Sequence, residues 1–205
     1  MTEPDRPQIY LVTPPAFDPE VFAPRLAAVL DRVPVACLRL ALATGDEDAI
    51  LRAGDTLRAV AHARDVPIVI ERHVLMVDRL GLDGVHLMDG ARSVRAVRKD
   101  LGAEAIVGAW CHATRHDGIS AGEAGADYVS FGPVGGALGD GKLAEADIFA
   151  WWSEMIELPV VAEGGLDADL IRALAPFTDF FALGEEVWRH DDPAAALVAL
   201  TAALD

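Results

Sequence analysis

Residues Gly125–Pro133 read GADYVSFGP, a short apolar run that ends in a glycine and a proline. Similar runs recur along the whole chain, each rich in Val, Ile, Leu or aromatic residues. Working outward from this one, the runs are Gln8–Thr13, Val35–Leu40, Pro67–Ile70, Gly84–Leu87, Ala105–Trp110, Tyr128–Gly132, Pro159–Ala162 and Phe180–Leu183. Short, continuously apolar runs are typical of strands that are buried on both faces of a parallel sheet.

Amphipathic stretches separate the apolar runs and predict helices. Glu47–Arg64 and Pro193–Leu204 place apolar residues three and four positions apart, and Asp147–Ile156 is a third such stretch. Asp192 before Pro193 reads as an N-cap followed by a proline in the first turn. Strands and helices that alternate in this way predict a (β/α)8 TIM barrel, formed as one domain over residues 1–205. An open doubly wound sheet is the alternative.

Composition excludes several classes of protein. The 205 residues are 52% hydrophobic, and 17 basic against 33 acidic residues give a net charge of −16. This charge argues against nucleic acids and anionic membranes as partners. Two cysteines, Cys37 and Cys111, make no disulfide framework. We find no signal peptide and no membrane span, so we expect a cytoplasmic protein.

In a TIM barrel the chemistry lies at the carboxyl ends of the strands, which directs attention to Arg39. Side chains alternate along a strand, so Cys37, Arg39 and Ala41 share one direction. An arginine inside a barrel mouth needs an anion beside it. That anion is either a substrate phosphate or an internal carboxylate, Glu71 or Glu163, and the sequence leaves both open.

The fifth run ends in Trp110, Cys111 and His112. His112 is a candidate general base because the ordinary pKa of histidine lies near neutrality, or else a hydrogen-bonded residue at a strand end. Cys111 is expected to be a small buried residue rather than a nucleophile.

Glycines follow the last three runs. Five of them between Gly132 and Gly141, ahead of Lys142, predict a flexible loop that could cover the mouth. Gly164, Gly165 and Gly184 stand where barrels often hold a phosphate with backbone N–H groups. The acidic residues Glu163, Glu185 and Glu186 oppose this use, because like charges about 4 Å apart repel by about 4 kcal/mol at an effective dielectric near 20.

Four segments, in order, resemble the thiamine phosphate synthase family and its thiazole tautomerase relative. They are Tyr10-Leu11-Val12-Thr13, Gly84-Val85-His86-Leu87, Gly125–Pro133 and Val161-Ala162-Glu163-Gly164-Gly165. The resemblance implies a TIM barrel that works in thiamine biosynthesis. The family's synthase uses magnesium to join a hydroxymethylpyrimidine pyrophosphate to a thiazole phosphate, and the pyrophosphate leaves before the thiazole nitrogen attacks.

Several of the family's polar positions are changed. The family's Gln-x-Arg-x-Lys reads Cys37, Arg39 and Ala41, so only the arginine remains. Its Asn-Asp pair, where the Asp serves the metal, reads Glu71-Arg72. A second metal Asp would fall near Ala91, two residues after Asp89.

The later strand ends depart as well. A family Ser corresponds to Trp110, and a Thr-x-Thr-Lys segment corresponds to residues 137–140, with Lys142 displaced by two. The Ser after the eighth strand becomes Gly184 or Glu185. Because diphosphate needs cations and donors around its oxygens, we predict a degenerate active site with weak or absent synthase turnover.

Three hypotheses remain open: a rearranged active synthase, a tautomerase-like isomerase that uses His112 and Arg39, and a non-catalytic ligand-binding or assembly protein. We assign no metal ligand, and magnesium only if synthase activity is retained. The expected partner is a thiazole- or pyrimidine-like small molecule, with a homo-oligomer as a further possibility. The candidate site residues are Arg39 and His112 for catalysis; Cys37, Glu71, Trp110, Gly132 and Lys142 for substrate; and Gly164, Gly165 and Gly184 for phosphate.

Overall fold

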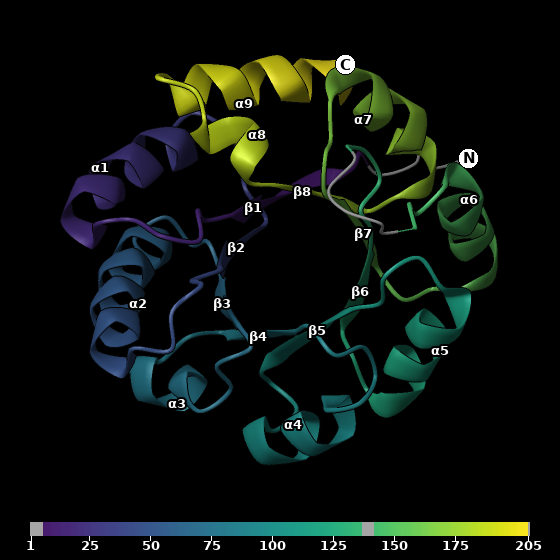
Figure 1. Cartoon of the computed structure of the whole chain (residues 1–205), viewed down its shortest axis with the longest axis horizontal. Coiled ribbons are helices and arrows are strands. Elements are labelled where there is room, and N and C mark those ends of the chain that lie inside the picture. The colour runs from purple at the N-terminus through teal and green to yellow at the C-terminus, as the bar shows by residue number, and fades with distance from the viewer. Residues whose placement is uncertain (1–5, 137–141, 205) are drawn as a thin grey trace.

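A computed structural model describes residues 6–136 and 142–204, and its strands close into a parallel barrel ringed by helices (Figure 1). Each strand pairs with the next along the chain, and the last pairs with the first. The strands are β1 (Gln8–Val12), β2 (Cys37–Leu40), β3 (Ile68–Glu71), β4 (Gly84–Leu87), β5 (Ile106–Trp110), β6 (Tyr128–Phe131), β7 (Val160–Glu163) and β8 (Phe180–Leu183). The predicted TIM barrel is confirmed, and the open sheet is wrong.

Helices cover the outside of the strand ring. They are α1 (Pro19–Leu30), α2 (Glu47–His62), α3 (Met76–Leu80), α4 (Val94–Leu101), α5 (Arg115–Ala124), α6 (Ala146–Met155), α7 (Ala168–Leu174), α8 (Glu185–Trp188) and α9 (Pro193–Thr201), with 3-10 turns at Ala175–Phe177 and Ala202–Leu204. The predicted N-cap is confirmed, since the Asp192 carboxylate accepts from the Ala195 N–H. Across residues 6–136 and 142–204, no helix has the length and apolarity that a membrane crossing requires.

The predicted strand boundaries differ from the structure by one or two residues at half of the strand ends. β2 begins at Cys37 rather than Val35, and β3 extends one residue further, to Glu71. The structure adds α8, a single helical turn between β8 and α9 that the sequence did not predict. A four-residue helix has too few residues to show a 3.6-residue period.

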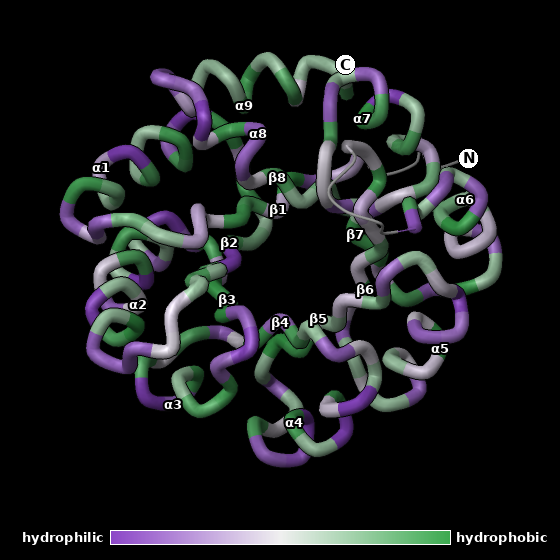
Figure 2. The backbone as a smooth tube through the Cα atoms, in the orientation of Figure 1, coloured by the Kyte–Doolittle hydropathy of each residue, from purple (hydrophilic) through white to green (hydrophobic). Residues whose placement is uncertain are grey.

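Alternation along the strands creates two apolar regions. Side chains that face outward pack against the helices in one large core, whereas those that face inward fill the barrel. Figure 2 shows the inner ring as mostly hydrophobic, with hydrophilic stretches on the outer helices. Tyr128 needs the space left by Gly108, where a Cβ would lie 2.0 Å from its ring.

The strand register stacks the inward residues in layers of four, each layer taken from alternate strands. From the amino end the layers are Cys37, Gly84, Tyr128, Phe180; then Tyr10, Val69, Gly108, Val161; then Arg39, His86, Ser130, Ala182; and at the carboxyl-end mouth Val12, Glu71, Trp110, Glu163. Polarity therefore rises toward the mouth, where a ligand would enter.

Candidate active site at the carboxyl-end mouth

A pocket of about 580 Å³ opens at the carboxyl ends of β1, β2, β7 and β8. Four acidic side chains and two arginines line it. These charged residues are Arg39, Glu163, Asp167, Glu185, Glu186 and Arg189. The pocket lies where the barrel fold places ligands, but its balance of charges is acidic.

Arg39 forms an internal ion pair inside the mouth. Its two terminal nitrogens donate to the two carboxylate oxygens of Glu163, each at 3.1 Å. Its Nε lies 3.7 Å from a carboxylate oxygen of Glu71. Of the two anions that the sequence left open for Arg39, the structure thus supplies the internal carboxylates.

Charge neutralisation keeps Arg39 ionised although it is only 5% exposed. Burial alone disfavours the guanidinium, but the Glu163 carboxylate outweighs burial and holds the pKa of Arg39 above its ordinary value. With Glu163 bound bidentately, the guanidinium has little capacity left for a ligand phosphate.

A neutral network adjoins this ion pair, with His86 in the same layer as Arg39 and both tyrosines in the layers below. The hydroxyls of Tyr10 and Tyr128 are 2.6 Å apart, and the Tyr128 hydroxyl is 3.0 Å from His86 Nδ1. Burial raises the pKa values of both tyrosines and, with the nearby charge of Arg39, holds the pKa of His86 well below its ordinary value. All three side chains therefore stay neutral.

Polar atoms without partners gather in the layer that holds Arg39. Four buried side-chain polar atoms of the described residues have no hydrogen-bond partner, and three of them lie here: Arg39 Nε, His86 Nε2 and Ser130 Oγ. The fourth is Arg58 Nε on α2. Because unpaired buried polar atoms are rare and costly, this layer offers hydrogen bonds to a polar group that reaches below the mouth.

Glu186 fills the position expected for a phosphate. One carboxylate oxygen accepts from the N–H groups of Gly165 and Leu166, at 3.0 and 3.2 Å, and the other accepts from Gly184 N–H at 3.0 Å. We call these three N–H groups the amide cradle. Two of the predicted phosphate glycines thus do hold an anion, but that anion is the chain's own carboxylate.

Gly164 plays a different part from the one expected. Its carbonyl accepts from the N–H groups of Val134 and Gly135, at 3.0 and 2.9 Å, so it fixes the β7 loop against the loop after β6. The third donor of the cradle is Leu166, which the sequence did not suggest because any residue can donate a backbone N–H.

His112 lies exposed at the rim, where Trp110 orients its ring. The indole Nε1 donates to His112 Nδ1 at 3.0 Å. Because Nδ1 accepts this bond, the neutral ring carries its proton on Nε2. The backbone of His112 has a φ of +52°, and Arg72 at the end of β3 has +68°. Strained backbone at two strand ends of the mouth is typical of a functional site.

The other candidates lie elsewhere. Cys37 begins β2 in the bottom layer, far below the mouth, where burial raises its pKa to about 12. Gly132 packs against Glu163, since an added Cβ would lie 2.2 Å from the Glu163 carbonyl oxygen. Lys142 is exposed, and the preceding residues 137–141 of its loop are outside the described part of the chain.

The family's metal position does not fit the arrangement seen here. Arg72 stands at the position of the metal Asp, and Glu71 stands at the Asn before it. The two carboxylate oxygens of Glu71 face Arg39 and Arg72 at 3.7 and 3.3 Å. Asp89 accepts a hydrogen bond from Ser93 at 2.6 Å. Within residues 6–136 and 142–204, no group of three or more His, Cys, Asp or Glu side chains could hold a metal ion.

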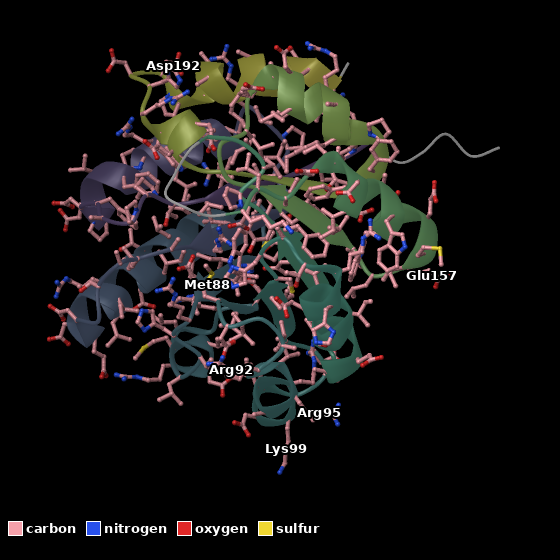
Figure 3. All side chains as sticks on the ribbon, turned by 45° about the vertical axis from the view of Figure 1, so that its right-hand side comes forward. Met88, Arg92, Arg95, Lys99, Glu157 and Asp192 are labelled. Atoms are coloured by element: carbon pink, nitrogen blue, oxygen red, sulfur yellow. The ribbon has the colours of Figure 1, made fainter. Side chains whose placement is uncertain are left out.

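Exposed cations of α4 do not compensate for the acidic mouth. Arg95 and Lys99 point away from the barrel on the outer side of α4 (Figure 3). They cannot reach a ligand at the barrel axis.

Sequence reasoning missed the neutral network. Alternation along β1, β4 and β6 could have revealed it, because it points Tyr10, His86 and Tyr128 inward at neighbouring levels. The clue was the inward-facing Gly108, which leaves room for the ring of Tyr128.

Comparisons with known proteins agree on one family. The family model for thiamine monophosphate synthase matches residues 9–183. The thiamine-phosphate synthase of Rhodospirillum centenum is 44% identical over 195 residues, which cover 94% of each chain. That of Hyphomonas neptunium is 36% identical over 96% of this chain and 93% of its own.

Solved structures show the same fold. Thiamine phosphate pyrophosphorylase from Pyrococcus furiosus superposes with a TM-score of 0.83 at 22% identity, over 96% of this chain and 95% of the other. A 3-hexulose-6-phosphate synthase superposes with a TM-score of 0.73 at 18% identity, over 97% of this chain and 100% of its own, and shows that the barrel itself is widely shared. On the family model and the close relatives together, this chain belongs to the thiamine monophosphate synthase family.

Proposed function

We propose that this protein works in thiamine biosynthesis by binding a thiazole- or pyrimidine-like compound at the carboxyl-end mouth, with weak or absent synthase turnover. Its family and its relatives' names support the pathway. The proposal of weak or absent synthase turnover rests on one observation, the Glu186 carboxylate in the amide cradle.

The synthase reaction needs positive charge where pyrophosphate departs. Here Arg39 is engaged by Glu163, and Glu186 occupies three N–H donors. Removing a single oxyanion donor costs about 3–4 kcal/mol in a transition state, so the loss of several slows turnover by many orders of magnitude. Ligand binding survives better, because a planar ring can lie beside Trp110 without any phosphate contact.

Pyrophosphate release tests this proposal directly. We expect no magnesium-dependent pyrophosphate from hydroxymethylpyrimidine pyrophosphate and thiazole phosphate above an enzyme-free control, even with protein and substrate at equal concentration. The Rhodospirillum centenum relative, assayed in parallel, is the positive control. Turnover within about tenfold of that relative would establish an active synthase with a rearranged site, which the relatives' names favour.

A second candidate is an isomerase of the tautomerase type, which the Trp110–His112 hydrogen bond favours. That bond positions the imidazole at the rim, where His112 can exchange a proton with a ligand once Nδ1 is released from the indole N–H. Solvent deuterium should then exchange into the thiazole compound, and His112→Ala should reduce the exchange rate by about 10²–10⁴-fold. Trp110→Phe, which lacks the indole N–H, is the companion variant. An unchanged exchange rate in His112→Ala would exclude the isomerase.

The remaining parts of the proposal concern location and partners. We infer a cytoplasmic protein that binds a small molecule and no nucleic acid or membrane, since its net charge of −16 repels both polyanions. A homo-oligomer remains part of the proposal, and sedimentation of the purified chain would measure it.

A further inference from the structure

The amide cradle is saturated by Glu186. Both carboxylate oxygens accept hydrogen bonds, from donors on two separate loops that follow β7 and β8. This is the arrangement with which proteins bind free anions through backbone groups. The Glu186 carboxylate belongs to the same chain as the cradle. Its effective concentration there is therefore fixed, whereas a free anion must compete from solution.

The donors of the cradle cannot spread to admit a second anion. Gly165 has a φ of +72°, and an added Cβ there would lie 2.0 Å from the Gly135 carbonyl oxygen. Gly184 is held against β1, where its added Cβ would lie 3.3 Å from the Val12 Cβ. Close backbone packing on both sides thus fixes the cradle at its present size.

The residues after Glu186 anchor its backbone. Val187 is fully buried and Trp188 is 8% exposed. The Trp188 indole N–H donates to the Val12 carbonyl at 2.6 Å. Because α8 is pinned to β1 in this way, the Glu186 side chain is held over the cradle.

Charge in the pocket acts against an added anion in the same direction. Glu163, Asp167 and Glu185 line the pocket together with Glu186, against two arginines, of which Arg39 is already paired with Glu163. A phosphate dianion would have to expel the Glu186 carboxylate and then lie among the remaining acidic groups. A hydroxyl group meets neither obstacle, because it can donate to a lone pair of a carboxylate that stays in place.

We propose that Glu186 determines the specificity of this mouth: it selects the unphosphorylated, hydroxyl-bearing form of the ligand over the phosphate monoester. This inference rests on the proposed binding function and names its substrate class. The class is a neutral heteroaromatic primary alcohol whose hydroxyl points toward the β7 and β8 loops.

Calorimetric titration with the thiazole alcohol and with its phosphate monoester tests the proposal. The wild-type chain should bind the alcohol at least about tenfold more tightly than the monoester. Glu186→Ala should reverse this preference, and it should also gain saturable binding of inorganic phosphate. Glu186→Gln, which keeps the shape and removes the charge, should fall between the two and guards against a folding defect in Glu186→Ala.

Glu185→Ala is the matched control. It removes the same charge one residue earlier, from an exposed side chain that makes no hydrogen bond to the cradle. Because Glu185 adds only to the charge of the pocket, this variant should weaken the wild-type preference far less than Glu186→Ala does. An equal shift in Glu185→Ala and Glu186→Ala would mean that the general field of the pocket selects the ligand, and the proposal would be wrong.

Three other outcomes would overturn the role of Glu186. They are a wild-type preference for the monoester, no wild-type binding of the alcohol, or an unchanged ratio of the two affinities in Glu186→Ala. These results are separate from the test of turnover. Pyrophosphate release would contradict the proposed weak synthase, whereas a monoester preference without release would contradict only the role of Glu186.

Discussion

Two buried groups of polar side chains lie next to each other in the barrel, and burial has opposite outcomes for them. In the neutral group, Tyr128 hydrogen-bonds to both Tyr10 and His86, and all three side chains are held neutral. In the charged group, Arg39 is equally enclosed but remains charged, because Glu163 and Glu71 flank it.

The difference shows what a counter-charge does in a low-dielectric interior. Without a carboxylate partner, desolvation shifts a titratable group toward its neutral form, as it does for His86. With a partner bound through two hydrogen bonds, the charge of Arg39 persists. The carboxylates of the charged group belong to the mouth layer, so the chain's interior charges are placed where a ligand meets them.

The largest effect is expected from a variant that lacks the Arg39 guanidinium. Arg39→Met leaves the Glu163 and Glu71 carboxylates buried without their common partner. Breaking a buried ion pair from one side costs about 3–5 kcal/mol, and we expect a loss of that size in the free energy of unfolding. Urea titration followed by circular dichroism measures it. Arg39→Met combined with Glu163→Gln should recover part of the loss.

Arg64→Met is the surface control for this experiment. Arg64 makes the same kind of two-pronged contact with Asp31, at 2.7 and 3.0 Å, but on the outside of the barrel. Because water screens that pair, its removal should matter far less. Equal losses in Arg39→Met and Arg64→Met would show that burial does not distinguish the two pairs.

The sequence was sufficient for the barrel, and it gave the Arg39 ion pair as one of two open alternatives. Eight apolar runs in parallel order leave few other topologies, and the alternation of side chains put Arg39 on the same side as the carboxylates that end β3 and β7. Which carboxylate it would prefer was not predictable. Glu163 provides two parallel hydrogen bonds and Glu71 a 3.7 Å contact, a difference set by rotamers and strand stagger.

The position of the Glu186 side chain could not be predicted from the sequence, for a different reason. Sequence reasoning recognised that Glu186 intrudes on a phosphate position, but its hydrogen bonds depend on α8, a single turn whose direction follows from the burial of Trp188. The donors are backbone N–H groups, which carry no mark in the sequence. Such contacts become visible only when two loops, joined to different strands, are placed side by side.

The pH dependence of stability tests the neutral group of side chains, and its expected effect is smaller than that of Arg39→Met. The pKa of His86 in the folded chain lies well below its ordinary value, because burial and the charge of Arg39 disfavour the protonated ring. In the unfolded chain histidine titrates near about 6.5. Below that pH the unfolded state takes up a proton that the folded state refuses, so stability is lost as the pH falls.

His86→Asn removes this linkage while leaving a polar group near the Tyr128 hydroxyl. The free energy of unfolding of the wild type, minus that of His86→Asn, should be constant at about pH 7–8. It should shrink by about 1.4 kcal/mol per pH unit below about 6.5. Urea titrations of both proteins across that range measure the difference, in which the other histidines cancel. A difference that stays constant down to about pH 5 would mean that His86 takes up its proton in the folded barrel, and that the neutral group is not held neutral by burial.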